Sequence, residues 1–200
     1  MRKLLVFNGS PKKQGTVGQL LRAVSESAGA DCEIEWIDIN DLTFKPCQGC
    51  MKCRTLKRCV LPHDDAHDVS EKIKQADGLI IGTPVYWGNM NGYLKMLFDR
   101  IVPSLMDEKK NGLPVALHRG KKAVIVTACT TQWPFNFIAR ESRGAIAALH
   151  EILGYSGYKV VGKLVKPGTK LNASIPKGLI QKACKLGRKL SKWPRPSEQK

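Results

Sequence analysis

Long hydrophobic runs are missing from this 200-residue sequence. No apolar stretch approaches the ~20 residues that a transmembrane helix needs. The first apolar run, at residues 4–7, is too short for the hydrophobic region of a signal peptide. With no export signal in view, we expect a cytoplasmic protein. Its cysteines would then stay reduced, which favours metal ligation over a disulfide framework.

Nucleotide-binding fingerprints are missing as well. The sequence has neither G-x-G-x-x-G nor G-x-x-x-x-G-K-[ST], so a nucleotide triphosphate is not indicated. It also has no internal repeat and no low-complexity segment. At this length the expectation is one α/β domain. We expect it to span residues 1–193, with residues 194–200 as a disordered basic tail.

Acidic residues are scarce. There are 17 Asp and Glu against 33 Lys and Arg, which gives a net charge of +16. The imbalance is strongest in residues 159–200, where 12 basic residues stand against one acid. Such a positive field speeds encounters with acidic proteins, nucleic acid or anionic lipid without discriminating among them. A solvated basic helix face would give the same pattern.

Cysteine, in contrast, is concentrated. Four of the seven cysteines lie in segment 46–60 with the spacing C-x2-C-x2-C-x5-C, at Cys47, Cys50, Cys53 and Cys59. Triplet spacing lets thiolates of one loop converge, and bacterial ferredoxins hold iron–sulfur clusters with a similar run. Zinc sites usually need a second C-x2-C pair or histidines, and here only His63 lies close enough to substitute. A [4Fe-4S] cluster is the leading interpretation. Zinc and a metal-free loop of reduced thiols are the alternatives.

The hydrophobic pattern predicts five strands alternating with helices. Short apolar or alternating runs predict strands at residues 3–8, 32–39, 78–82, 122–128 and 158–165. Helical spacing predicts helices at 16–28, 65–75, 91–105, 136–153 and 176–193. Asp64 and Asp65 are expected to cap the second of these helices, and Gly154 to end the fourth. Residues 107–119 are left as a polar connection. This alternation is typical of a doubly wound parallel sheet, with ligand sites beyond the carboxyl ends of the strands.

Three loops that follow strands carry the unusual residues, and we call them the rim loops. The first, at 9–15, leads into a helix start, a geometry that aims free backbone N–H groups at an anion. The second, at 84–89, and the third, at 129–135, bring aromatic residues and hydroxyls. They would meet at one sheet edge and wall a site for a flat ligand. Packing of Tyr86 and Trp87 under a loop is the alternative. Cys129 is interpreted as a packed strand-end residue rather than a nucleophile.

Together these motifs resemble a known family. The motifs Gly9-Ser10-Pro11-Lys12-Lys13 with Gly15-Thr16, Pro84-Val85-Tyr86-Trp87-Gly88-Asn89-Met90 and Leu94-Lys95-x3-Asp99-Arg100 are similar to those of the flavodoxin-like NAD(P)H-dependent FMN reductases. The cysteine segment, followed by Asp64-Asp65, resembles that of the iron–sulfur flavoproteins of anaerobes. The resemblance implies a flavodoxin-like, five-stranded parallel sheet of order 2-1-3-4-5, with the cysteine segment inserted after the second strand.

The resemblance also implies which residues bind cofactors. The FMN phosphate would be held by Ser10, Lys12, Gly15, Thr16 and Val17. The isoalloxazine ring would be lined by Pro84, Val85, Tyr86, Trp87, Gly88 and Asn89, and its other rim by Cys129, Thr130 and Thr131. The cluster would be ligated by the four cysteines of segment 46–60. One position departs from the pattern: relatives usually have Gly-Asn-Thr where this chain has Gly15-Thr16-Val17, so one polar phosphate contact is lost.

The implied function is electron transfer between a [4Fe-4S] cluster and FMN, with no catalytic side chain required. The implied partner is an acidic carrier such as ferredoxin, and the implied assembly is a homodimer or homotetramer. The basic residues near the thiolates, Lys52, Arg54, Lys57 and Arg58, would favour both cluster reduction and docking of that carrier. The alternative is a cluster-free enzyme in which NAD(P)H reduces FMN, and FMN reduces a quinone, a nitro compound or free flavin. A nucleic-acid-binding module would leave the rim loops unexplained.

Overall fold

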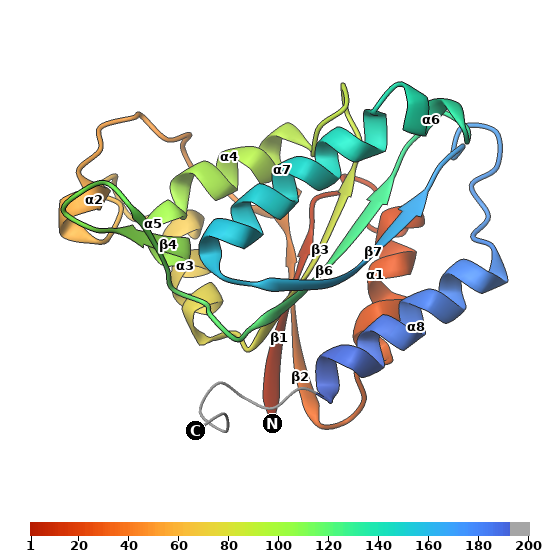
Figure 1. The fold of residues 1–200 in the computed structure, drawn as a ribbon, viewed down its shortest axis with the longest axis horizontal. Coiled ribbons are helices and arrows are strands. Elements are labelled where there is room, and N and C mark those ends of the chain that lie inside the picture. The colour runs from red at the N-terminus through yellow and green to blue at the C-terminus, as the bar shows by residue number, and fades with distance from the viewer. Residues whose placement is uncertain (193–200) are drawn as a thin grey trace.

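A five-stranded parallel sheet forms the centre of the protein in this computed structural model, which describes residues 1–192 (Figure 1). The strands are β1 (Arg2–Asn8), β2 (Cys32–Asp38), β3 (Gly78–Pro84), β6 (Lys122–Ala128) and β7 (Lys159–Lys166). Their spatial order is β2-β1-β3-β6-β7, and every neighbouring pair is parallel. Counted along the chain, this is the predicted flavodoxin-like order 2-1-3-4-5, which is therefore confirmed.

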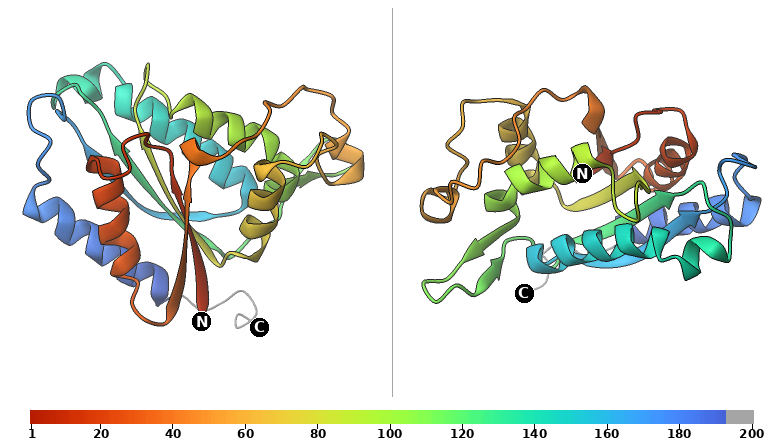
Figure 2. Two further views of the ribbon diagram at one scale, coloured as in Figure 1. Left: turned by 180° about the vertical axis from the view of Figure 1, so that it is seen from behind. Right: turned by 90° about the horizontal axis from the view of Figure 1, so that it is seen from above.

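Helices cover both faces of the sheet (Figures 1 and 2). One face carries α1 (Thr16–Glu26) and α8 (Lys177–Ser191), and the other carries α3 (Asp65–Gln75), α4 (Gly92–Arg100) and α7 (Glu141–Ser156). Leu4 and Val6 of β1 pack in the first core, whereas Leu5 and Phe7 pack in the second. Strands buried on both faces have continuous apolar sequences, which explains the runs that predicted them.

The basic C-terminal region is explained in part by α8. Its buried side chains are Ala183, Leu186 and Leu190, and its exposed ones include Lys182, Lys185, Arg188 and Lys189. The positive charge therefore covers the outer face of an amphipathic helix, in agreement with the solvated basic helix face considered above. The expected tail at 194–200, and Trp193 at the expected end of this helix, lie outside the described residues.

The predicted helix at 91–105 is interrupted. The structure ends α4 at Arg100 and begins a separate short helix, α5 (Val102–Leu105), with Pro103 in its first turn. Proline has no backbone N–H to donate to the preceding turn, so it favours a helix start over a helix interior.

The helix predicted at 136–153 was also wrong at both ends. The chain forms a short helix, α6 (Phe135–Ile138), and then α7, with Arg140 in a left-handed conformation (φ 58°) between them. Gly154 lies inside α7 rather than at its end, and the C-cap is Gly157 with φ 90°. Either glycine could end a helix, and only the packing of the chain that follows places the helix end at Gly157 rather than at Gly154.

The connection predicted at 107–119 contains an antiparallel hairpin. It pairs β4 (Met106–Glu108) with β5 (Pro114–Ala116). The signal that could have found it is the dipeptide Asn111-Gly112, since Gly112 takes φ 80° in the turn and Asn-Gly is a strong hairpin signal. Of two further short helices, η1 (Ile39–Asp41) precedes the cysteine segment and α2 (Cys53–Leu56) lies within it. No helix among residues 1–192 is both long enough and apolar enough to cross a membrane.

Candidate functional site

The structure brings the three rim loops together at one edge of the sheet. They leave from β1, β3 and β6, which are adjacent in the sheet. Asn8 is paired with Gly82, and Pro84 with Ala128, so the strands end at nearly the same level. The prediction that these loops meet follows from parallel topology and is met here.

The first rim loop ends in an uncapped helix. The Ser10 hydroxyl accepts a hydrogen bond from the Lys12 N–H (3.2 Å), and the Gly15 N–H donates to the Lys12 carbonyl (2.9 Å), which turns the loop toward α1. No described side chain caps the first turn of α1. Its N–H groups and the positive end of the helix dipole suit an anion. The Val17 side chain is buried, so this residue offers only its backbone N–H.

A glycine that sequence reasoning missed supports this loop. A Cβ at Gly18 would lie 2.0 Å from the Lys13 carbonyl oxygen, which no side chain tolerates. The loop can therefore lie against α1 only because position 18 is glycine. The Lys13 ammonium forms ion pairs with Asp41 and Asp38. Lys12, which is exposed, is the other lysine of the loop.

The second rim loop is a tight turn that displays aromatic residues. The N–H of Tyr86 donates to the carbonyl of Asn89 (2.9 Å), and the N–H of Asn89 returns the bond (3.0 Å). Trp87 and Gly88 between them have φ of 50° and 72°, as in a type I′ turn. Trp87 is fully exposed (104%) and Tyr86 is half-exposed (47%), so the alternative in which both pack under a loop is wrong. A tryptophan in left-handed backbone is strained, which points to a function for the displayed ring.

Two neighbouring elements fix the position of this turn. Asn91 caps α4 by accepting hydrogen bonds from the N–H groups of Tyr93 (2.8 Å) and Leu94 (3.2 Å). From the other side, α7 approaches so closely that a Cβ on Gly144 would lie 2.0 Å from the carbonyl oxygen of Gly88. Gly144 was not singled out from the sequence, because its contact lies 56 positions away along the chain.

The third rim loop begins at a buried cysteine. Cys129 is 3% exposed, and its N–H donates to the Lys166 carbonyl (3.1 Å). Burial, aided by the nearby negative charge of Glu141, raises the pKa of this thiol. A protonated, buried thiol agrees with the predicted packed residue and not with a nucleophile. The Thr131 hydroxyl donates to Glu141 (2.8 Å), whereas Thr130 is exposed. Beyond them the loop and the short helix α6 expose Trp133, Phe135, Phe137 and Ile138.

The four cysteines of segment 46–60 line one cavity of about 100 Å³. All four are free cysteines. Burial raises the pKa of Cys53; the charge of Arg54 opposes this shift, and the other three thiols add to it. Even so, no three His, Cys, Asp or Glu side chains within residues 1–192 form a group that could hold a metal ion. The donor set thus fits a cluster chemically, while the thiols are not drawn together in the ligating arrangement.

Arg100 also lines this cavity. It is buried, and its Nε–H has no hydrogen-bond partner among the described residues. A buried donor without an acceptor is unfavourable, and a sulfur anion in the cavity would supply that acceptor. This orphaned donor is a second observation in favour of an anionic occupant. His63, the substitute zinc ligand considered above, instead pairs with Asp68 (3.3 Å) and stacks on His67.

Two of the four basic residues near the thiols are neutralised. The Arg54 guanidinium pairs with Glu108 of β4 (2.7 Å), and Lys57 pairs with Asp107 of the same strand. No ion pair involving Lys52 or Arg58 is formed within residues 1–192, and both are exposed. The positive surface beside the cysteines is therefore smaller than the sequence suggested.

The cysteine segment and the rim loops lie on different sides of a single chain. In Figures 1 and 2, α2 and its flanking loop lie beside α5 and the β4–β5 hairpin, whereas α6 and the third rim loop lie at the opposite end of the sheet. Both groups follow the carboxyl ends of strands, but β2 is an edge strand and sends the cysteine segment outward.

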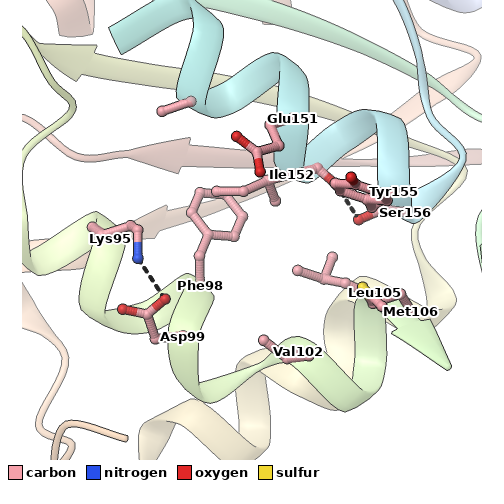
Figure 3. Close-up of a pocket in the computed structure, with 11 residues that line it drawn as sticks. Lys95, Phe98, Asp99, Val102, Leu105, Met106, Glu151, Ile152, Tyr155 and Ser156 are labelled. Carbon is pink, nitrogen blue, oxygen red and sulfur yellow. Dashed lines mark hydrogen bonds and ion pairs between the residues drawn. The ribbon is translucent and has the colours of Figure 1, made fainter. Parts of the chain in front are cut away.

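A third feature is an apolar groove between α4, α5 and α7, with a volume of about 250 Å³. Figure 3 shows Phe98 of α4 extending toward Ile152 of α7, with Val102, Leu105 and Tyr155 around them. An ion pair between Lys95 and Asp99 (2.6 Å) borders the groove. No cysteine and no rim-loop residue lines it.

The sheet order, the two helical layers and the rim at the carboxyl edge define a flavodoxin-like α/β protein. The sequence model of the NADPH-dependent FMN reductases matches residues 2–159, so the chain belongs to this family of flavin-dependent oxidoreductases.

Curated relatives agree with that assignment, and a solved structure shares the fold. An iron–sulfur flavoprotein of Methanocaldococcus jannaschii is 38% identical over 102 residues, which cover 50% of this chain and 52% of that protein. One from Archaeoglobus fulgidus is 42% identical over 98 residues, 49% of this chain and 48% of that protein. The chain thus spans about half the length of the curated relatives it matches. The NAD(P)H:quinone oxidoreductase from Methanothermobacter marburgensis superposes with a TM-score of 0.71 at 18% identity, over 94% of this chain and 98% of that one. That last likeness concerns the fold.

Proposed function

We propose that this protein is an FMN-dependent oxidoreductase in which electrons pass between FMN and a [4Fe-4S] cluster. The observation that carries the proposal is the single cavity lined by Cys47, Cys50, Cys53 and Cys59, in a chain of the FMN reductase family. FMN would supply two-electron chemistry and the cluster one-electron chemistry, and the protein sets their position and surroundings. The names of the relatives support the cluster.

The rim loops would bind FMN. The backbone N–H groups of Thr16 and Val17, the Ser10 hydroxyl and the Lys12 ammonium would hold the phosphate, with Gly15 allowing its close approach to the backbone, since the start of α1 carries no side-chain cap. The ring would lie against the second rim loop, Pro84, Val85, Tyr86, Trp87, Gly88 and Asn89, and face Cys129, Thr130 and Thr131. The exposure of Tyr86 and Trp87 supports this placement, because flat aromatic surfaces suit a flat ligand.

The assembly would be a homodimer or homotetramer. In one chain the cysteine segment lies apart from the rim loops (Figure 1). A second copy would bring one chain's cluster near the other's flavin. The apolar groove between α4 and α7 is the surface we assign to that contact.

The electron donor would be an acidic carrier such as ferredoxin, docking near Lys52 and Arg58. Both side chains are exposed beside the cysteines, and neither forms an ion pair within residues 1–192. Docking through such charges speeds association at low ionic strength. A reduction rate that stays constant between low and high salt would argue against this surface.

The second candidate is a cluster-free reductase in which NAD(P)H reduces FMN, and FMN reduces a quinone, a nitro compound or free flavin. The observation that favours it is the arrangement of the thiols, which form no metal-holding group within residues 1–192. The family is also described by its use of NADPH. The cysteine segment would then be structural.

Cofactor analysis separates the two candidates. The chain would be purified without oxygen, and FMN, iron and acid-labile sulfide measured per chain. We expect one FMN with about four irons and four sulfides. The Cys50→Ala variant should lose the iron and keep FMN. The matched control is Cys184→Ala in α8, far from the segment, which should keep both. FMN without iron in the wild-type protein would select the cluster-free reductase.

A further inference from the structure

We propose that Arg100 is a positioning residue for the cluster: it fastens both ends of the cysteine segment and places a buried positive charge against the cluster's sulfurs. The inference rests on the proposed function, because it assumes that the cysteines hold a cluster. It concerns a side chain on α4 that sequence reasoning recorded only as part of a motif.

The first step is the way Arg100 joins the ends of segment 46–60. Its guanidinium donates two parallel hydrogen bonds to Asp64, from Nη1 to Oδ2 (2.8 Å) and from Nη2 to Oδ1 (2.9 Å). Nη1 also donates to the carbonyl of Lys45. Lys45 comes just before the segment, and Asp64 follows a few residues after Cys59. One planar group therefore holds the entry and the exit of the segment against the end of α4.

The second step is the rigidity of the partner. Asp64 is the N-cap of α3, and it forms a capping box with His67. It also accepts a hydrogen bond from the Lys45 N–H (3.3 Å). Burial alone would raise the pKa of Asp64, but the hydrogen bonds from Arg100 and Lys45 outweigh it and hold that pKa below its usual range. The carboxylate stays ionised and keeps α3, α4 and the segment in one network.

The third step is the charge that faces the cysteines. The Arg100 side chain is only 1% exposed. It lines the same cavity as the four thiols. Its Nε–H is buried and has no acceptor in the described chain. The Nη1 and Nη2 groups of the guanidinium thus bind the two ends of the segment, and the Nε–H remains to donate to a cluster sulfur.

Arginine suits both tasks and lysine suits only one. A lysine would keep a positive charge but could not bind Asp64 through two parallel bonds while reaching the Lys45 carbonyl. Replacing Arg100 by lysine therefore keeps the positive charge while removing the paired hydrogen bonds to Asp64. Hydrogen bonds to cluster sulfurs and nearby positive charge both favour the reduced cluster, so removing them should shift its reduction potential to more negative values.

The test measures iron content and the cluster reduction potential in protein purified without oxygen. For Arg100→Met we expect less iron per chain and a more negative potential. For Arg100→Lys we expect less iron than in the wild type, with a potential closer to that of the wild type than the Met variant has. For Asp64→Asn, which removes a negative charge beside the same guanidinium, we expect a shift toward more positive potential. Arg188→Met, on the exposed face of α8, is the matched control and should change neither quantity.

The opposite signs for Arg100→Met and Asp64→Asn separate an electrostatic role from mere loosening of the segment, which would move both variants the same way. Should Arg100→Met fail to fold, Arg100→Lys and Asp64→Asn still decide the matter. Iron in the wild type together with unchanged iron and potential in the Arg100 variants would overturn this inference alone. A wild-type protein that binds no iron would overturn the proposed function, and this inference with it.

Discussion

Among single residues, His118 couples protonation to folding in the acid range. It is buried, its ring stacks on Tyr158 with centroids 4.8 Å apart, and Nε2 is hydrogen-bonded to the Ser104 carbonyl (2.7 Å). Burial lowers the pKa of His118 to about 4, with Lys121 adding to the shift and the Ser104 bond opposing it. The unfolded chain, with a histidine pKa of about 6.5, therefore binds the proton more tightly than the folded one.

Protonation of this histidine should consequently lower the stability of the fold as the pH decreases. As pH decreases from about 6.5 to about 4, we expect the free energy of unfolding to drop by up to about 3 kcal/mol, with no further loss from this group below that range. Urea unfolding across this window would measure the drop. His118→Gln should have a weaker pH dependence, whereas the exposed His150→Gln should match the wild type. Equal slopes in all three proteins would contradict the argument.

The same residue scale shows what the sequence could reveal. The four cysteines and the rim residues were recognisable because their type and spacing alone suggest chemistry. Arg100 and His118 were not, since an arginine or a histidine is usually exposed and only the packed helices around these two bury them. Gly18 and Gly144 were missed for a related reason. Each is needed for a close backbone approach, and that approach exists only after folding.

At the scale of elements, α7 contains two glycines that ought to respond oppositely to the same substitution. Gly154 has no atom within 4 Å of an added Cβ, so Gly154→Ala should stabilise the protein by up to about 1 kcal/mol through helix propensity. Gly144→Ala would push the Gly88 carbonyl aside and displace the second rim loop. We expect lower stability and weaker FMN binding for this variant. Thermal unfolding and an FMN titration measure the two effects, and equal FMN affinity in both variants would refute the role of Gly144.

The buried strands and helices were easier to predict from the sequence than the short exposed ones. All five strands of the central sheet were placed. The central strands β1, β3 and β6 carry apolar runs because both of their faces are covered, whereas the edge strand β2 alternates polar and apolar residues. The hairpin β4–β5 was not, since strands of three residues are too short to show a period. Helix ends were wrong where two residues of the right type competed, as with Gly154 and Gly157. In that case the close packing of Gly157 against Ala116 and Arg119 marks the helix end.

For the whole molecule, topology predicted that the rim loops would share one edge, but nothing in the sequence predicted that the cysteine segment would point away from them. That separation gives the groove between α4, α5 and α7 its importance. Phe98, Val102 and Ile152 line an opening on the surface, and Tyr155 beside them is 52% exposed. An exposed apolar groove of this kind is unfavourable in water and is commonly covered by a partner.

A second copy of the chain is the partner we expect there, and a charge placed in the groove should prevent it from binding. Tyr155→Glu would bury a carboxylate in an apolar contact, a cost that weakens association by several orders of magnitude when no counter-charge is available. Light scattering coupled to size exclusion should give a dimer or tetramer for the wild type and a monomer for Tyr155→Glu. Leu171→Glu, at a residue 73% exposed between β7 and α8, should keep the wild-type mass. If electrons must cross between chains, the monomeric variant should also retain its FMN and iron while transfer between them slows. A variant that stays oligomeric would place the subunit contact on another face.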